Sequence, residues 1–107
     1  MTAASIAGAI SFVNLAHAAA PGDPAQGHAK FAACVACHGA DGRTPTSPGF
    51  PRIGGQNPAY VAAALRAYRS GERNGGMAAM MQPMAKPLSD QDIDNLASYI
   101  ATLGPQK

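Results

Sequence analysis

The sequence predicts an all-α fold in which three main helices are joined by long irregular loops. Three segments, at about residues 24–36, 57–70 and 89–103, place apolar residues at helical spacing and carry helix start or stop signals. The two stretches between them, 39–56 and 74–87, contain the glycines and prolines that interrupt regular structure. No stretch has the alternating pattern of a convincing β-strand, and no internal repeat is present.

Length and composition fit one small domain with a modest core. The chain has 107 residues, a formal net charge of +2, few aromatic side chains and no tryptophan. Its arginines are scattered along the chain, so a nucleic-acid partner is not expected. No apolar stretch approaches the ~20 residues of a membrane span. Because large apolar side chains are scarce, a buried cofactor would help the core to close.

Residues 1–18 have the pattern of the later parts of a secretory signal peptide. The segment has no charged side chain, is apolar over residues 6–15, and ends in Ala-His-Ala at 16–18, a small-x-small cleavage pattern. The usual positive amino-terminal region is missing, and the alternative is an uncleaved apolar tail or short helix. Export would leave residues 19–107 as a single domain in an oxidising compartment, which we expect to be the periplasm.

The first helix is expected from Pro24 to about Ala36. Asp23 before Pro24 is a start signal, because an acidic cap precedes a proline in the first turn. At helical spacing then follow Gly27, Phe31 and Cys34. The loop over 39–56 is long for a compact domain, and such a loop usually needs a group to wrap around.

The second and third helices have clear ends. Asn57 caps the second helix, a proline follows at once, and Gly71 ends it. Its apolar stripe consists of Val61, Ala64, Leu65 and Tyr68. The third helix begins with Ser89 and Asp92, three residues apart as in a capping box, and Gly-Pro at 104–105 stops it. Its apolar face consists of Ile93, Leu96, Ala97, Ile100 and Leu103.

The stretch CVACH contains both cysteines of the chain, Cys34 and Cys37, and places His38 directly after them. A disulfide across so short a loop would stabilise the chain weakly. A structural zinc site needs four ligands, and His28 and His38 lack the spacing to complete one. A thioredoxin-like pair expects a βαβ pattern, which is absent. Covalent haem attachment uses every residue of the motif, because both thiols add to haem vinyl groups and the imidazole reaches the iron.

A proximal histidine leaves the sixth position of the iron to be assigned. An open position would permit oxygen or peroxide chemistry, whereas a second protein ligand leaves electron transfer. A methionine thioether is a soft ligand that raises the reduction potential. The segment before the last helix offers Met77, Met80, Met81 and Met84. Each of them could instead fill a gap in the core, and the residues alone do not choose among the four.

The chain resembles the class I c-type cytochromes, and more narrowly one domain of the di-haem c-four group or a single-haem relative. The resemblance runs from Gly22 to Gly104. It is carried by the stretches GDPAQG, CVACHGADG, FPRIGGQ, YVAAALRAYRSGER and MQPMAKPLSDQDIDNLASYI. It implies the cytochrome c fold, three main helices with long loops wrapped around one haem.

Position by position, the resemblance implies the following site. Cys34 and Cys37 would hold one haem c, and His38 would be the proximal ligand. In this family the axial methionine lies eight residues before the serine that caps the last helix. Counted back from Ser89, that residue is Met81.

The resemblance also implies contacts around the haem. The carbonyl of Pro51 would accept a hydrogen bond from Nδ1–H of His38 and so fix the ring, although a turn residue is the alternative. Gly27 and Tyr99 match the pair where the first and last helices cross. Weaker assignments, each with a solvated or packing role as the alternative, are the propionate contacts Arg52, Gln56 and Tyr60 and the pocket-lining residues Tyr68 and Met84.

The resemblance implies an exported electron carrier rather than an enzyme. It would exchange one electron with a donor and an acceptor protein, as a monomer in brief encounters with small interfaces. The alternatives are a cytochrome subunit bound permanently to a larger dehydrogenase or oxidase, and a haem enzyme or gas sensor with a labile sixth ligand.

Overall fold

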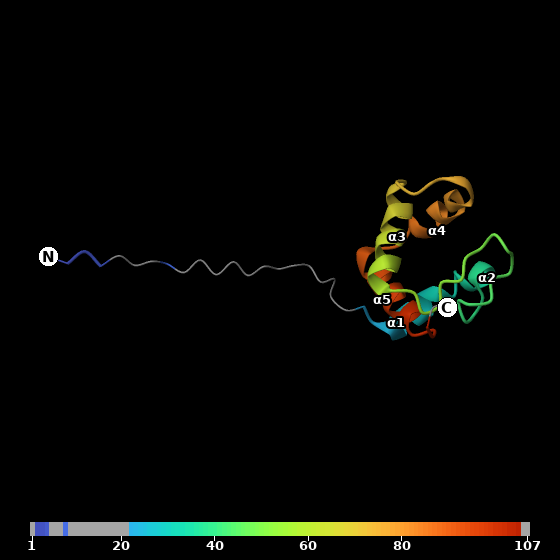
Figure 1. Cartoon of the computed structure of the whole chain (residues 1–107), viewed down its shortest axis with the longest axis horizontal. Coiled ribbons are helices and arrows are strands. Elements are labelled where there is room, and N and C mark those ends of the chain that lie inside the picture. The colour runs from blue at the N-terminus through green and yellow to red at the C-terminus, as the bar shows by residue number, and fades with distance from the viewer. Residues whose placement is uncertain (1, 5–7, 9–21, 106–107) are drawn as a thin grey trace.

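The computed structural model describes residues 2–4, 8 and 22–105 of the chain. The predicted leader over 1–18 therefore lies outside the described residues, apart from 2–4 and 8. The described part is helical and contains no strand. Its elements are α1 (Pro24–Phe31), α2 (Val35–His38), α3 (Pro58–Ser70), the 3₁₀ helix η1 (Gly76–Met81), α4 (Gln82–Ala85) and α5 (Asp90–Ala101) (Figure 1).

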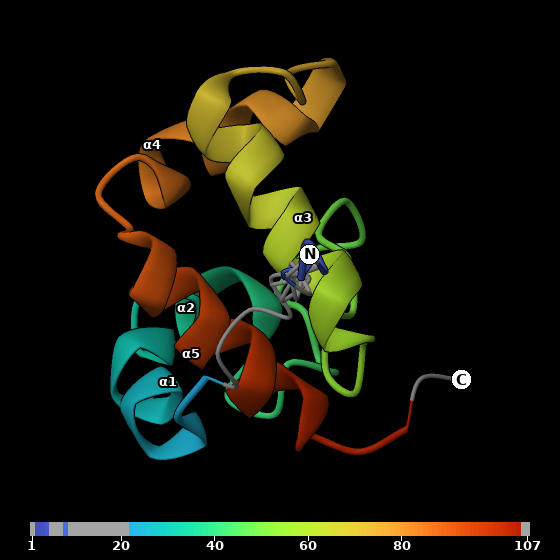
Figure 2. The same cartoon turned by 90° about the vertical axis from the view of Figure 1, so that its left-hand side faces the viewer.

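The core lies where α5 packs against both α1 and α3 (Figure 2). Its fully buried large side chains are Phe31, Ile93 and Leu96. Around them are buried Val61, Ala62, Leu65, Ala97 and Ile100. On α3 the structure buries Ala62, whereas Ala64 and Tyr68 of the predicted stripe are only half-buried. No helix among the described residues is long and apolar enough to cross a membrane.

The close crossing of α1 and α5 requires a glycine, which has no side chain, at position 27. A β-carbon on Gly27 would lie 2.0 Å from the carbonyl oxygen of Asn95 and 2.8 Å from Cβ of Tyr99. The glycine therefore meets the backbone of α5 as well as the expected tyrosine. The Tyr99 ring stacks on exposed His28, with centroids 4.8 Å apart, and meets Phe31 edge-on at 5.2 Å.

A buried amide ties the two helices together at the same place. The side-chain oxygen of Asn95 accepts hydrogen bonds from the backbone N–H of Asp23 and from the side chain of Gln91, both at 2.8 Å. Its nitrogen donates to the side chain of Gln26 at 3.4 Å. Because a buried polar group must be hydrogen-bonded, these contacts also fix the position of Asn95. Sequence reasoning assigned this residue no role.

The first helix is shorter than predicted. It ends at Phe31, and a turn over residues 32–34 separates it from α2. The backbone N–H of Cys34 bonds to the carbonyl of Phe31 at 2.7 Å, a three-residue bond that tightens the turn and interrupts the α-helical ladder. The Cys-x-x-Cys-His segment therefore forms its own short helix, set apart from α1 in Figure 1.

The structure differs from the prediction in two further segments. The stretch 74–87, expected to be irregular, contains η1 and α4. Alanine and methionine favour helix, and Pro83 lies in the first turn of α4, where its missing N–H costs nothing. Helix α5 ends at Ala101, before the predicted glycine stop, because the Thr102 hydroxyl donates to the carbonyl of Tyr99 at 2.6 Å and closes the last turn.

Other local predictions are confirmed. The side chain of Asn57 accepts from the N–H of Tyr60, and Gly71 ends α3 in the left-handed conformation with φ 83°. Ser89 and Asp92 form a reciprocal capping box at the start of α5. The loop over 39–56 contains neither helix nor strand.

We predict that Gly27→Ala lowers the free energy of unfolding by about 3 kcal/mol, because the new methyl group would overlap the α5 backbone. Denaturant unfolding measures the change. Gly75→Ala is the control, since a β-carbon there meets nothing within 4 Å. Equal stability of the two variants would contradict the backbone contact at the crossing.

The capping box should make the free energy of unfolding depend on pH in the acidic range. The backbone N–H of Ser89 donates to Asp92 at 3.0 Å, and this bond, helped by Lys30 at 3.6 Å, holds the pKa of Asp92 below its ordinary 3.8. A lowered folded-state pKa stabilises the fold above the ordinary pKa, and that contribution is lost as pH falls through the lowered value.

Asp92→Asn keeps an acceptor oxygen but does not titrate. The loss of unfolding free energy between pH 5 and pH 2.5 should therefore be smaller in this variant than in the unaltered chain. Urea unfolding at both pH values measures it. Glu72→Gln, which removes a charge from an exposed loop residue, is the control. If both variants lose stability in acid as the unaltered chain does, the carboxylate of Asp92 does not contribute in this way.

Candidate haem site

The Cys-x-x-Cys-His side chains come from one tight turn of chain. Cys34 is the N-cap of α2 and His38 is its last residue. The carbonyl of Cys34 accepts from the backbone N–H groups of Cys37 at 3.3 Å and His38 at 2.9 Å. Both cysteines are half-buried free thiols, with no disulfide between them. This turn holds two sulfurs and one imidazole on a segment of five residues.

The surroundings of the thiols bear on the competing interpretations of the motif. Burial, with a smaller contribution from neighbouring Cys37, raises the pKa of the Cys34 thiol to about 11. A thioredoxin-like reactive cysteine has a lowered pKa instead. Within the described part of the chain, no three His, Cys, Asp or Glu side chains gather as a metal site.

The imidazole of His38 is buried, with 7% of its surface exposed. Its Nδ1 lies 2.9 Å from the carbonyl oxygen of Pro51, the pair of atoms expected from the sequence. A carbonyl can only accept, so Nδ1 carries the hydrogen and Nε2 keeps its lone pair. That arrangement fixes the ring and leaves one nitrogen as a metal ligand. The donor set therefore fits a haem iron.

The loop after α2 folds back on the motif. Thr46 donates from its hydroxyl to the carbonyl of Ala36 at 2.9 Å, and from its backbone N–H to the carbonyl of Cys37 at 3.0 Å. Gly39 has φ 84°, and a β-carbon there would lie 2.3 Å from the carbonyl oxygen of Thr44. Glycine is thus required at the point where the loop turns back over α2.

An acidic side chain organises the same loop. Asp41 accepts from the backbone N–H groups of Arg43 at 2.8 Å and Thr44 at 2.9 Å, and from the Thr44 hydroxyl at 2.9 Å. These bonds, the one from Arg43 first, hold the pKa of Asp41 below its ordinary value. Sequence reasoning passed over Asp41 and Thr46. An Asp-Gly pair with threonine three residues after the aspartate is a turn signal that could have identified the first of them.

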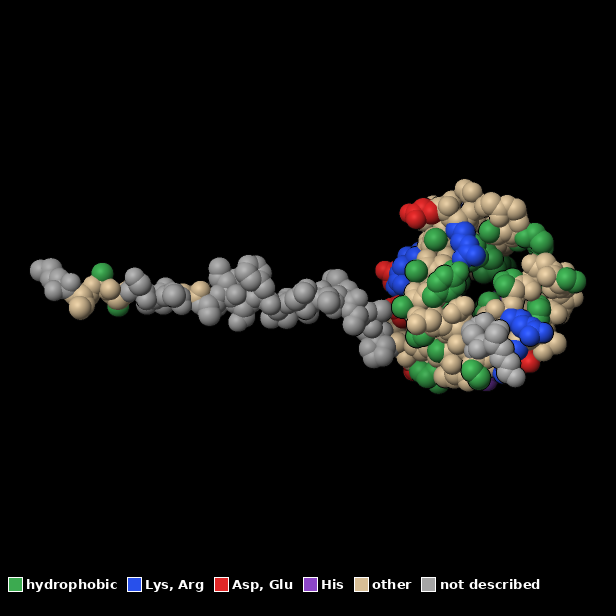
Figure 3. All heavy atoms as spheres, in the orientation of Figure 1, with side chains coloured by type: hydrophobic (Ala, Val, Ile, Leu, Met, Phe, Trp, Pro, Cys, Tyr) green, Lys and Arg blue, Asp and Glu red, His purple; other side chains and the backbone are tan. Residues whose placement is uncertain are grey.

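The four methionines differ in their surroundings. Met81, the last residue of η1, is half-buried and packs against the core. Met77, Met80 and Met84 are 50%, 54% and 43% exposed. Figure 3 shows the molecule hollowed between the arm that contains α4 and the loop after α2, with hydrophobic side chains around the hollow. Of the two methionines nearest to α5 in the sequence, Met81 is half-buried against the core and Met84 is exposed.

The remaining predicted residues do not gather at one point. Arg52 and Tyr60 are exposed. The side-chain oxygen of Gln56 accepts from the backbone N–H of Asn57 at 2.8 Å. Tyr68 is half-buried, and the guanidinium carbon of Arg73 lies 4.8 Å from its ring centroid.

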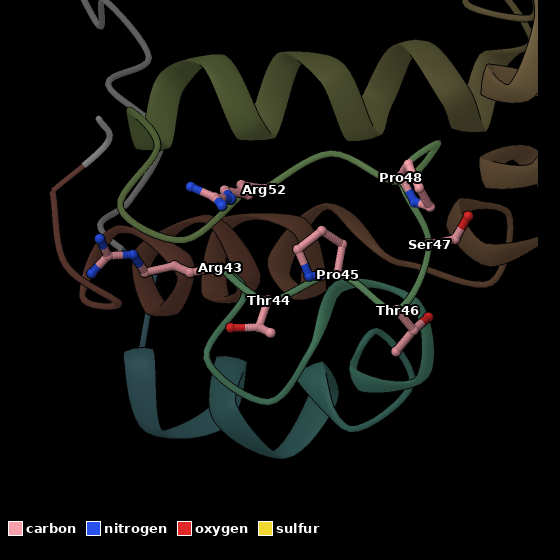
Figure 4. A pocket seen from close by; sticks show the side chains of 7 residues that line it. All are labelled: Arg43, Thr44, Pro45, Thr46, Ser47, Pro48 and Arg52. Atoms are coloured by element: carbon pink, nitrogen blue, oxygen red, sulfur yellow. The ribbon is translucent and has the colours of Figure 1, made fainter.

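A pocket of about 360 Å³ lies along the loop after α2, with two arginines at one end in Figure 4. It is lined by Arg43, Thr44, Pro45, Thr46, Ser47, Pro48 and Arg52. Of the predicted site residues only Arg52 lines it, and Arg43 was not expected. Neither His38 nor a methionine lines this pocket, so it is distinct from the place where iron ligands would meet.

Comparison with known proteins agrees with this site. The family model described as "Cytochrome c" matches residues 24–104. Cytochrome c-554(548) of Halomonas halodenitrificans is 47% identical over 81 residues, which cover 76% of this chain and 96% of that protein. Cytochrome c4 of Pseudomonas aeruginosa is 41% identical over 93 residues, covering 87% of this chain and 43% of that protein.

A protein named "Thiosulfate dehydrogenase electron acceptor" from Thiomonas intermedia is 41% identical over 81% of this chain and 39% of its own length. The chain thus spans nearly all of one relative and less than half of the other two. It belongs to the cytochrome c family. Its helical architecture is the all-α cytochrome c fold, and it is an electron-transfer protein that carries one covalent haem c.

Proposed function

We propose that this chain is an exported carrier of single electrons whose haem iron is held between Nε2 of His38 and Sδ of Met81. Cys34 and Cys37 attach the haem through two thioether bonds. The observation that carries the proposal is the buried imidazole of His38, whose Nδ1–H is committed to the carbonyl of Pro51. Its other nitrogen can only accept, which is the role of an axial ligand.

Attachment would need only the two thiols and the vinyl groups of the porphyrin. Each thiol would add across one vinyl group, with its sulfur bonded to one carbon and its hydrogen to the other. The tight turn over α2 holds the two sulfurs at a fixed spacing. Burial raises the pKa of the Cys34 thiol to about 11, so the thiol is protonated near neutral pH in the chain without haem.

The chain's own residues hold the ligands in one geometry. When bound, haem c supplies a one-electron couple between ferric and ferrous iron. The hydrogen bond to Pro51 restrains the imidazole, and packing against the core restrains Met81. Ligands that stay in place in both oxidation states require little rearrangement, which favours electron transfer. Occupation of both axial positions also leaves no open position for substrate, so we propose that the protein is not an enzyme.

The choice of Met81 rests on burial and position. It contacts the core, whereas Met77, Met80 and Met84 are each at least 43% exposed. It also lies eight residues before Ser89, as the family resemblance requires. From the family resemblance we assign Met84 and Tyr68 to the wall of the proposed haem pocket, which is not the pocket along the loop after α2, and the propionate contacts to Arg52, Gln56 and Tyr60.

The leader pattern over 1–18 supports export to the periplasm, leaving 19–107 as the carrier domain. Its partners would be one electron donor and one acceptor. A relative is named as an electron acceptor of thiosulfate dehydrogenase, so a dehydrogenase is one candidate donor. The second candidate function is a cytochrome subunit bound permanently to such an enzyme. Size-exclusion chromatography of the native protein from its source separates the two, since a stable large complex would contradict a free carrier.

Met81→Ala should abolish the low-spin spectrum of the haem-loaded protein and lower its reduction potential by on the order of 0.2 V, within the ~0.8 V range that axial ligands set. Absorption spectroscopy and redox titration measure both effects. Met84→Ala should leave the spectrum low-spin. The reverse pattern would move the ligand assignment to Met84, and fast cyanide binding by the unaltered protein would argue for an open iron.

Covalent attachment is tested by acid–acetone extraction of protein made with haem-maturation machinery. The unaltered chain should keep all of its colour in the polypeptide. Cys34→Ala with Cys37→Ala should release all of it, because no thioether can form. A colourless unaltered chain, or colour retained by the double variant, would overturn the attachment site.

A further inference from the structure

The side chain of Met77 contacts Gly49, which belongs to a different segment of the chain. A β-carbon built on Gly49 would be 2.7 Å from Sδ of Met77 and 2.9 Å from its Cε. The thioether therefore occupies the space that a side chain at position 49 would need. Met77 belongs to η1 and Gly49 to the loop after α2, and the two segments face each other on the side of the molecule away from α1 in Figure 1.

Gly49 adjoins residues that contact His38, and Met77 is close in sequence to Met81. Gly49 immediately precedes Phe50, whose ring centroid is 6.5 Å from that of His38, and Pro51, whose carbonyl accepts from the same imidazole. Met77 lies four residues before Met81 in the same 3₁₀ helix, η1. The contact thus joins the segment that orients the histidine to the segment that presents the methionine.

The segment that presents Met81 lies against α3 and runs directly into α4. None of the residues of η1 is buried, however. A β-carbon on Gly75 or Gly76 would meet nothing within 4 Å, so the approach to η1 runs through open space. Met81 packs against the core at one end of η1, and Met77 contacts Gly49 near the other. Few buried contacts mean that a segment opens easily, so each remaining contact matters.

We propose that Met77, seated on Gly49, is a positioning residue that keeps the thioether of Met81 on the haem iron. It acts by restraining the start of η1 against the loop after α2. The inference rests on the proposed ligation by Met81. Gly49 does not have a positive φ, and its missing side chain leaves the space that the Met77 thioether fills.

The test is the rate at which cyanide binds the ferric, haem-loaded protein, because cyanide can bind the iron only after the thioether of Met81 has dissociated from it. Met77→Ala should raise this rate about fivefold, the factor expected for losing half the burial of a methionine side chain. Gly49→Ala should also raise it, by no more than Met77→Ala does, since its methyl group pushes the flexible end of the Met77 side chain off the loop. Met77→Leu, which refills the space, should restore a rate within twofold of the unaltered protein.

Two matched controls separate this contact from general loosening of the segment. Met80→Ala removes an equally exposed methionine of η1, and Gly75→Ala adds a methyl group where there is open space. Both should stay within twofold of the unaltered protein. The double variant Met77→Ala with Gly49→Ala should be no faster than Met77→Ala alone, because one contact is lost only once.

The proposal is overturned if Met77→Ala binds cyanide no faster than Met80→Ala, or if the two single effects multiply. A failure of the underlying ligation looks different. In that case Met81→Ala would leave the cyanide rate and the low-spin spectrum of the unaltered protein unchanged. If Met77→Ala does not fold, Gly49→Ala against Gly75→Ala and the rescue by leucine still decide the question.

Discussion

The close approach of α1 to α5 at Gly27 is the contact on which the remaining structure depends. A chain with few large apolar side chains gains stability by bringing backbones together and burying a small, dense core around Phe31, Ile93 and Leu96. Asn95 completes the contact by binding the first turn of α1. With α1 held on α5, the turn after Phe31 begins at a fixed place, and the Cys-x-x-Cys-His segment follows from it.

The site itself is made by irregular chain. Two arms extend from the helical core, the loop after α2 and the segment of η1 and α4, and the hollow lies between them. Asp41, Thr46 and the carbonyl of Pro51 give the first arm its shape and set the tautomer of His38. The second arm lies against α3, and its 3₁₀ helix η1 has no buried residue. The histidine is thus held by a hydrogen bond, and Met81 by packing against the core.

Local sequence signals, such as helix caps, were sufficient to predict most of the helices. Asn57 and Gly71 delimit α3, and Ser89 with Asp92 starts α5, because caps act within one turn of chain. The prediction of one helix over 24–36 was wrong, since the three-residue bond from Cys34 to Phe31 leaves no mark in the sequence pattern. The helical turns over 76–85 were missed because two glycines and a proline surround residues that otherwise favour helix.

The sequence alone determined the chemistry: two thiols and an imidazole at fixed spacing, with four candidate methionines, because covalent attachment depends on residue type and separation along the chain. Only the tertiary structure showed that Met81 packs against the core while its neighbours are exposed, placed Asn95 in the α1–α5 crossing, and set Met77 on Gly49. Those contacts join residues 28 to 72 positions apart, and their burial depends on how helices and loops pack rather than on any local pattern.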